Sequence, residues 1–81
     1  MATVKSDLYN RGFRKNSFLS EMYGKDTYRR RGHDIILEPE EKRATHDRER
    51  DGDVESTPVP LKKLGKYLDR QGFRSRADKG E

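Results

Sequence analysis

Apolar residues are scarce in this chain, and most of them lie towards its two ends. Only 28% of the 81 residues are hydrophobic, and eleven of them fall in residues 1–33, five in residues 34–56 and seven in residues 57–81. A packed core therefore has to join the two ends. The longest apolar run, Ile35-Ile36-Leu37, is far shorter than the roughly 20 residues of a membrane-spanning helix, so no transmembrane segment is expected.

Charge is sorted along the chain in three blocks. Residues 1–33 hold eight Lys and Arg against three Asp and Glu, residues 34–56 hold four against nine, and residues 57–81 hold seven against three. We interpret these blocks as a basic aromatic arm, an acidic spacer, and a basic amphipathic helix with a tail, together no more than one domain. Two basic arms around an acidic centre indicate docking on a polyanion, with the acidic block turned away from it.

The composition also bears on whether the chain folds alone. Charged residues make up 42% of it, and a chain so polar buries too little apolar surface to offset the entropy lost on ordering. There is no cysteine, which excludes a disulfide framework and a thiolate metal site. We therefore expect a small, mostly α protein with extended or intrinsically disordered segments, ordered with a partner.

Three segments carry helix signals. Helices are expected at residues 4–11, at residues 17–23, where Ser17 can cap the start, and at residues 60–71, where the pattern is strongest. The last two supply the side chains that we expect to pack on one another or in a partner's pockets: Phe18, Leu19, Met22, Leu61, Leu64, Tyr67 and Leu68.

The acidic centre has weaker signals. His33–Glu38 can form a short strand that Pro39 ends. Residues 39–51 have a proline at the start, glutamates in the first turn and a glycine after the end, which predicts a solvated charged helix or, equally, a disordered linker. Residues 51–60 are rich in Gly, Ser, Thr and Pro and are expected to form a loop.

A short segment occurs twice. Leu8-Tyr-Asn-Arg-Gly12-Phe13-Arg14 is echoed sixty residues later by Leu68-Asp-Arg-Gln-Gly72-Phe73-Arg74. Both copies are typical of helix ends, where glycine adopts a left-handed conformation and the next residue folds back on the last turn. The alternative is a duplicated contact motif, in which phenylalanine stacks on a base and arginine pairs with a phosphate.

Signals for catalysis are weak. The dipeptides His33-Asp34 and His46-Asp47 could suggest a metal-dependent hydrolase, but such a site needs more ligands held on a larger scaffold. The sequence has no phosphate-binding glycine loop, nucleophile elbow or zinc-ligand spacing. We expect a protein that is not an enzyme, with both histidines on the surface and no catalytic residue, metal or cofactor.

Basic and aromatic residues occur together in both arms, as a contact with nucleic acid requires. The rings expected to stack or to anchor the chain are Tyr9, Phe13, Tyr28 and Phe73. The cations expected to bind a polyanion are Arg11, Arg14, Lys15, Arg29, Arg30, Arg31, Lys62, Lys63, Lys66, Arg70 and Arg74.

The expected function is non-enzymatic binding and assembly. The partner would be a larger protein or a nucleoprotein, such as a virion or a ribosome-like particle, with RNA or DNA among the candidate ligands. The same residues also suit a regulatory peptide that binds an acidic protein surface without nucleic acid, since Tyr and Arg serve as anchors at protein interfaces. The N-terminal residues lack the hydrophobic stretch that a secretory signal requires. We therefore expect the protein inside the cell or within a virion, and we do not expect it to be secreted.

Overall fold

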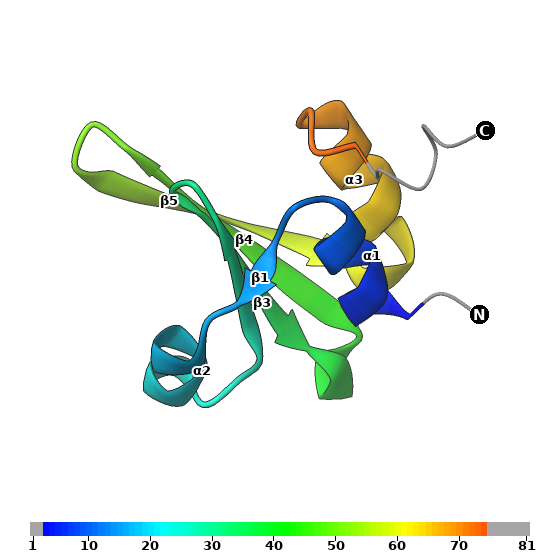
Figure 1. Ribbon diagram of the computed structural model, residues 1–81, viewed down its shortest axis with the longest axis horizontal. Helices are drawn as coiled ribbons and strands as arrows, with labels where there is room; N and C mark the ends of the chain where they lie inside the picture. Colours follow the sequence, from blue (N-terminus) through cyan, green and yellow to red (C-terminus); the bar gives the residue numbers. More distant parts are fainter. Residues whose placement is uncertain (1–2, 75–81) are drawn as a thin grey trace.

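An antiparallel sheet occupies the middle of the molecule, in a computed structural model that describes residues 3–74 (Figure 1). Its strands follow one another in chain order: β1 (Arg14–Lys15), β2 (Thr27–Arg30), β3 (His33–Glu38), β4 (Arg43–Arg50) and β5 (Asp53–Pro60). The helices are α1 (Val4–Asn10), α2 (Ser17–Tyr23) and α3 (Leu64–Arg70), with 3-10 turns η1 (Pro39–Glu41) and η2 (Leu61–Lys63).

The expectation of a mostly α chain with intrinsically disordered segments is wrong. The described chain folds onto a five-stranded sheet, and ten buried side chains form one core cluster. The helices expected at residues 4–11 and 17–23 and the strand at residues 33–38 are present as α1, α2 and β3, while the last helix is divided into η2 and α3. Most of the acidic block of residues 34–56 lies within the sheet, in β3, β4 and the first half of β5.

Residues 39–51 do not form a charged helix, and residues 51–60 do not form a loop. β4 pairs with β3 on one side and with β5 on the other. Ala44 and His46 are buried, whereas Thr45 between them is only partly buried and faces the opposite side of the sheet. This segment has the period of two that a half-buried strand requires, and it lacks the apolar stripe that would hold a helix on the core.

Two tight turns set the register of the hairpins. Arg31 and Gly32 join β2 to β3 with φ angles of 39° and 79°, and Asp51 and Gly52 join β4 to β5 with φ angles of 50° and 84°. Positive φ at both central residues is the geometry of type I′ turns, whose twist matches that of paired strands, and Asp-Gly is among their preferred sequences. Gly52, expected to stop a helix, therefore closes a hairpin.

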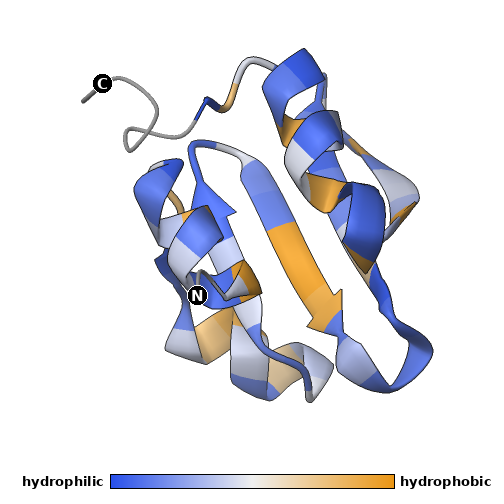
Figure 2. Ribbon diagram, turned by 90° about the vertical axis from the view of Figure 1, so that its right-hand side faces the viewer, coloured by the Kyte–Doolittle hydropathy of each residue, from blue (hydrophilic) through white to orange (hydrophobic). Residues whose placement is uncertain are grey.

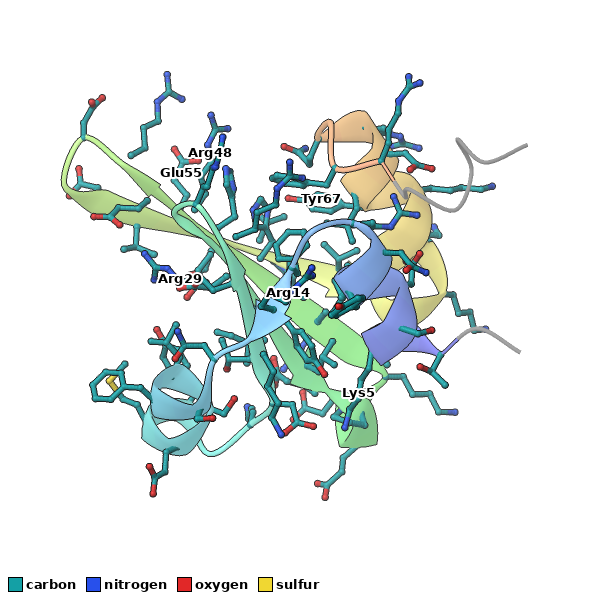
Figure 3. The ribbon with its side chains drawn as sticks, in the orientation of Figure 1. Lys5, Arg14, Arg29, Arg48, Glu55 and Tyr67 are labelled. Atoms are coloured by element: carbon teal, nitrogen blue, oxygen red, sulfur yellow. The ribbon has the colours of Figure 1, made fainter. Side chains whose placement is uncertain are left out.

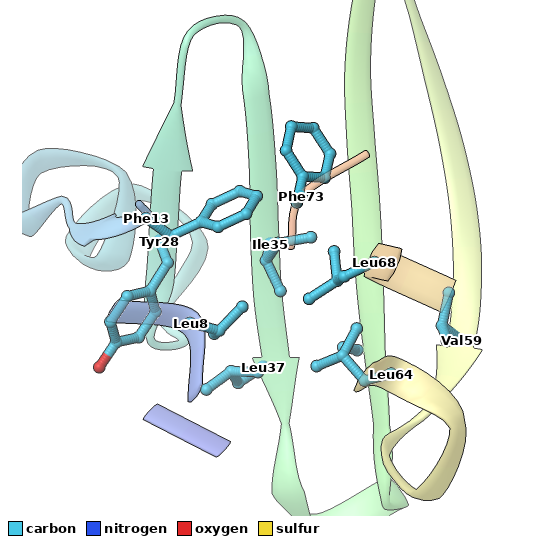
Figure 4. Close-up of a cluster of buried hydrophobic side chains, with 10 residues drawn as sticks. Leu8, Phe13, Tyr28, Ile35, Leu37, Val59, Leu64, Leu68 and Phe73 are labelled. Carbon is cyan, nitrogen blue, oxygen red and sulfur yellow. The ribbon is translucent and has the colours of Figure 1, made fainter. Parts of the chain in front are cut away.

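Helices α1 and α3 cover one face of the sheet, and the core lies between them and the strands (Figures 1 and 4). The most hydrophobic strand is β3 (Figure 2), in which Ile35 and Leu37 belong to the core cluster and Ile36 does not. Side chains before the sheet and after it, in α1 and α3, therefore share one core cluster with β3. The cluster consists of Leu8, Phe13, Tyr28, Ile35, Leu37, Ala44, Val59, Leu64, Leu68 and Phe73.

The repeated segments form two equivalent helix ends. Gly12 and Gly72 have φ angles of 90° and 92°. In both copies the N–H of the following phenylalanine donates to the carbonyl oxygen of the leucine five positions earlier, at 2.9 Å, which is the bond of a Schellman cap. The helix-end interpretation is confirmed. The rings of Phe13 and Phe73 meet edge to face, with their centroids 5.1 Å apart.

Arg11 joins these two helix ends. Its Nε donates to Asp7 at 3.0 Å, and its Nη1 donates to Asp69 at 2.5 Å and to the carbonyl oxygen of Phe73 at 2.8 Å. Burial acts to lower the pKa of Arg11, but the hydrogen bonds and charges of Asp69 and Asp7 raise it above its ordinary value. The buried guanidinium therefore stays charged and paired, as a buried charge must be.

Helix α2 lies on the other side of the sheet from α1 and α3 (Figure 1). Its N-cap is Asn16, whose side chain accepts a hydrogen bond from the N–H of Leu19, and not Ser17 as expected. Leu19 is buried, but Phe18 and Met22 are 73% and 58% exposed. These two side chains, expected to pack, therefore take no part in the core cluster.

Candidate polyanion-binding groove

Two arginines expected to bind a polyanion are held by other parts of the fold. Arg14 lies over the ring of Tyr9, 3.8 Å from its centroid, and donates to two backbone carbonyl oxygens beside it. Arg30 lies 5.0 Å from the ring centroid of Phe73 and donates to the carbonyl oxygen of Arg11. These guanidinium groups, like that of Arg11, connect α1, the sheet and the C-terminal helix end.

The other cations of the first block are not gathered on one surface. Lys15 and Arg29 lie 3.6 Å and 3.4 Å from aspartate oxygens. Arg29 and Arg30 are consecutive in β2, so their side chains point to opposite faces of the sheet. Arg31 is exposed in the turn after β2, and Arg74 is exposed after the last helix end.

Three of the four rings expected to stack on bases are inside the core. Phe13, Tyr28 and Phe73 are 0%, 7% and 8% exposed. Tyr9 is 57% exposed, but the guanidinium of Arg14 lies over its ring. A ligand cannot reach the three buried rings in this structure, and their contribution is to packing.

The C-terminal cations, in contrast, lie together on one surface. Lys62, Lys66 and Arg70 follow one another at a spacing of four residues along η2 and α3, and Lys63 lies among them. All four side chains are exposed. Within residues 3–74, no carboxylate forms an ion pair with any of them. Of the cations expected to bind a polyanion, these four are the ones that the structure brings together.

A pocket of about 380 Å³ lies between these cations and β5. We call it the α3–β5 groove. One wall is cationic, and the other is made of uncharged residues of the last strand. Tyr67, which is partly buried, belongs to the lining as well. The full lining consists of Thr57, Pro58, Val59, Pro60, Lys62, Lys63, Lys66, Tyr67 and Arg70.

A larger hollow, of about 630 Å³, has the opposite charge. Glu38 in its wall accepts hydrogen bonds from Arg43, Lys25 and Thr45, which lower the pKa of this carboxyl to about 2. A hollow rich in carboxylates repels a polyanion, so the sign of the charge favours the α3–β5 groove. The carboxylates that line the hollow are Asp26, Glu38, Glu40 and Glu41.

The backbone edge of β5 beside the groove has an unusual chemistry. β5 is the last strand of the sheet. The N–H of Leu61 donates to the carbonyl oxygen of Lys42 at 3.0 Å and continues the ladder with β4. Backbone groups along a strand point alternately to its two edges. Those of Pro60, Pro58 and Ser56, which lie one, three and five residues before Leu61, therefore point to the free edge, away from β4. Because proline has no N–H, the stretch beside the groove offers the carbonyl oxygen of Pro58 and no backbone donor before Ser56.

A chain of hydrogen bonds holds Tyr67 in place. Its hydroxyl lies 2.6 Å from Nδ1 of His46, and Nε2 of His46 lies 3.0 Å from Nδ1 of His33. Neutral imidazoles satisfy both bonds with the protons arranged in either direction along the chain. His46 is only 3% exposed, so the expectation that both histidines lie on the surface is wrong. The ring of His33 also contacts Phe73, with centroids 4.8 Å apart.

These histidines should make stability depend on pH. Burial lowers the pKa of both below the ordinary value of 6.5, and the charge of Arg48 lowers both further. As the pH falls below that value, the unfolded chain takes up protons that the folded chain does not, so the free energy of unfolding falls. We expect a decrease between about pH 7 and about pH 5, of at most about 1.4 kcal/mol per pH unit for each histidine.

Urea unfolding at several pH values in this range measures the effect. The double variant His33→Asn with His46→Gln removes both titrating groups and should show a flatter dependence. A wild-type curve as flat as that of the variant would contradict the prediction.

Sequence reasoning missed the contribution of the sheet to this site. Thr57 and Pro58 were assigned to a loop, and no partner was expected for His46. Arg48 faces Glu55 across the β4–β5 hairpin (Figure 3). The alternation of Ala44, His46 and Arg48 on one face was the available signal, and the expected helix over residues 39–51 concealed it.

Among residues 3–74, no three His, Asp or Glu side chains are grouped to hold a metal ion. No helix in that part of the chain is long and apolar enough to cross a membrane. No protein-family model matches the sequence, and neither a curated protein nor a solved structure resembles it significantly. The function is therefore argued from the groove itself.

Proposed function

We propose that this protein is a non-enzymatic binding protein that docks on a nucleic acid or nucleoprotein assembly through the α3–β5 groove. The observation that carries the proposal is the placement of four exposed cations around one pocket, with no ion-paired carboxylate on them within residues 3–74. Cations without internal partners are free to neutralise phosphates, which supplies most of the affinity for nucleic acid.

The spacing of these cations supports a linear ligand. Lys66 and Arg70 are four residues apart in α3, which places them about 6 Å apart along the helix axis. Lys62 extends the row into η2. A row of charges along a groove tracks a phosphate backbone better than a compact anion, since each cation can meet a different phosphate.

The distribution of charge over the molecule supports one orientation of docking. The chain has a net charge of +4, while the hollow beside α2 is acidic. The field of the whole molecule therefore attracts a polyanion, and the acidic hollow turns away from it. This orientation leaves α2, with its exposed Phe18 and Met22, clear of the ligand.

Another protein is the second candidate partner. The exposed side chains of Phe18 and Met22 on α2 favour it, because apolar anchors carry much of the energy of protein interfaces. The variant Phe18→Ser with Met22→Ser separates the two functions. It should leave binding of an oligonucleotide unchanged if the α3–β5 groove is the site.

Binding of labelled single-stranded RNA and DNA, followed by fluorescence anisotropy, tests the proposal. We expect affinity that weakens as salt rises from about 50 to about 200 mM, with a logarithmic slope of about −2 to −3 for three or four phosphate contacts. A flat salt dependence, or no binding at the lowest salt, would contradict it. Labelled dextran, which is uncharged, mixed with the wild-type protein gives the baseline anisotropy in the absence of binding.

A further inference from the structure

We infer that the α3–β5 groove takes a single strand of nucleic acid and prefers cytosine to uracil or thymine. This inference rests on the proposed function and adds to it the class of strand and the base preference.

The two walls of the groove match the two parts of a nucleotide. Lys62, Lys66 and Arg70 form the wall from η2 and α3, while Pro58 and Val59 belong to the uncharged wall from β5. A phosphate meets the first wall and a base meets the second. The volume of about 380 Å³ is at the lower end of the range for small-molecule sites, which suits one unstacked nucleotide at a time.

Tyr67 gives the pocket a rigid aromatic surface. Its side chain is partly buried and lines the groove, and its hydroxyl is held by Nδ1 of His46 at 2.6 Å. A ring fixed in this way loses little entropy when a base stacks on it, and stacking on aromatic side chains is a general means of binding single strands. A duplex, whose bases are already stacked, cannot use this surface.

The free edge of β5 supplies the base preference. Beside the groove it presents the carbonyl oxygen of Pro58, and neither Pro58 nor Pro60 has an N–H to donate. Cytosine carries an exocyclic amino group that can donate to this oxygen. Uracil and thymine carry a carbonyl oxygen at the equivalent position, and their imino N–H lies between two carbonyl oxygens, which would both approach the oxygen of Pro58. The edge therefore favours cytosine over uracil and thymine.

The same edge disfavours an acidic peptide. A peptide that adds a strand to a sheet needs alternating N–H and C=O groups along the edge. Pro58 and Pro60 remove two consecutive donors beside the groove. Charge alone would admit an acidic peptide, but the backbone could not pair with it there.

The comparison of oligo-dC with oligo-dU tests the inference, because these bases differ only in the amino group or carbonyl oxygen at position 4 and in the proton on the adjacent ring nitrogen. With strands of about 12 nucleotides and neutral pH, we expect oligo-dC to bind roughly fivefold to tenfold more tightly than oligo-dU. Equal affinities that both weaken with salt would overturn the base preference and leave the proposed function standing.

The variant Pro58→Ala tests the role of the edge. Alanine restores an N–H that can donate to the carbonyl oxygen of uracil, so the ratio of the two affinities should fall towards about 1. Pro39→Ala, at the start of η1 and outside the groove, is the matched control and should keep the wild-type ratio. An unchanged ratio in Pro58→Ala, with the circular dichroism spectrum of the wild type, would overturn the inference.

Two further probes identify the competing ligands. Tighter binding of a duplex, or of an oligo-glutamate peptide, than of oligo-dC would overturn the inference in favour of that ligand. Absence of binding to every probe at low salt would overturn the proposed function as well, so the two failures give different results.

Discussion

Phe73→Ala is expected to lower the free energy of unfolding by about 3–5 kcal/mol. The ring is 8% exposed, lies edge to face with Phe13, and contacts His33 and the guanidinium of Arg30. Removing it leaves a cavity where the two helix ends meet on the sheet. A domain is typically stable by about 5–15 kcal/mol, and one this small has a correspondingly small core. Much of the variant should therefore be unfolded at room temperature.

The chain offers a matched control for this substitution. Phe18→Ala removes the same side chain from α2, where it is 73% exposed, and should change the stability by no more than about 0.5 kcal/mol. Urea unfolding followed by circular dichroism measures both variants. Similar losses at the two positions would contradict the assignment of Phe73 to the core and of Phe18 to the surface.

The triple variant Lys62→Gln, Lys66→Gln and Arg70→Gln should bind single-stranded nucleic acid roughly 100-fold more weakly than the wild type. Each lost contact with a phosphate is taken as about 1 kcal/mol, the upper end for exposed ion pairs. The logarithmic salt slope should also become shallower by about 2, since three phosphates are no longer neutralised. Because all three side chains are exposed, the fold should be unaffected.

A second triple variant separates the groove from net charge. Lys5→Gln, Lys15→Gln and Arg31→Gln changes the net charge by the same amount on exposed residues of the first block. Lys5 and Lys15 lie near Asp26, and such exposed ion pairs contribute little to stability. We expect this variant to bind within about threefold of the wild type, a loss from the general field alone. An equal loss in the two variants would show that binding follows net charge and not the groove.

Local signals in the sequence predicted the helices and the central strand. The Gly-Phe pairs mark the ends of α1 and α3 because a left-handed glycine and a returning phenylalanine act within one helical turn. The apolar run of Ile35, Ile36 and Leu37 marks β3, and this signal is also local because the three residues are adjacent. Each of these features depends on residues close together in the chain.

The β4–β5 hairpin was missed because its stability depends on distant partners. β4 reads Arg-Ala-Thr-His-Asp-Arg-Glu-Arg and buries only Ala44 and His46, and neither is hydrophobic enough to reveal a period of two. The Asp51-Gly52 pair is a strong signal for a type I′ turn, and it was assigned to the end of a helix instead. Whether so polar a strand forms depends on β3 beside it, not on its own propensity.

The cations of the groove were predicted by their spacing on one helix face, but the role of the first arm was not. Arg11 and Arg30 have partners near the other end of the chain, since Arg11 pairs with Asp69 and Arg30 lies over Phe73. No local pattern separates an arginine that binds a phosphate from one that ties two helix ends together. The tertiary structure makes this distinction.

We propose the α3–β5 groove as the surface that binds nucleic acid. Titration of the ¹⁵N-labelled protein with oligo-dC, followed by amide chemical shifts, tests it most directly, because each residue reports on its own surroundings. We expect the largest shifts at Thr57, Lys63, Lys66, Tyr67 and Arg70, which line the groove. Shifts confined to residues 11–31, or no shifts at low salt, would contradict it.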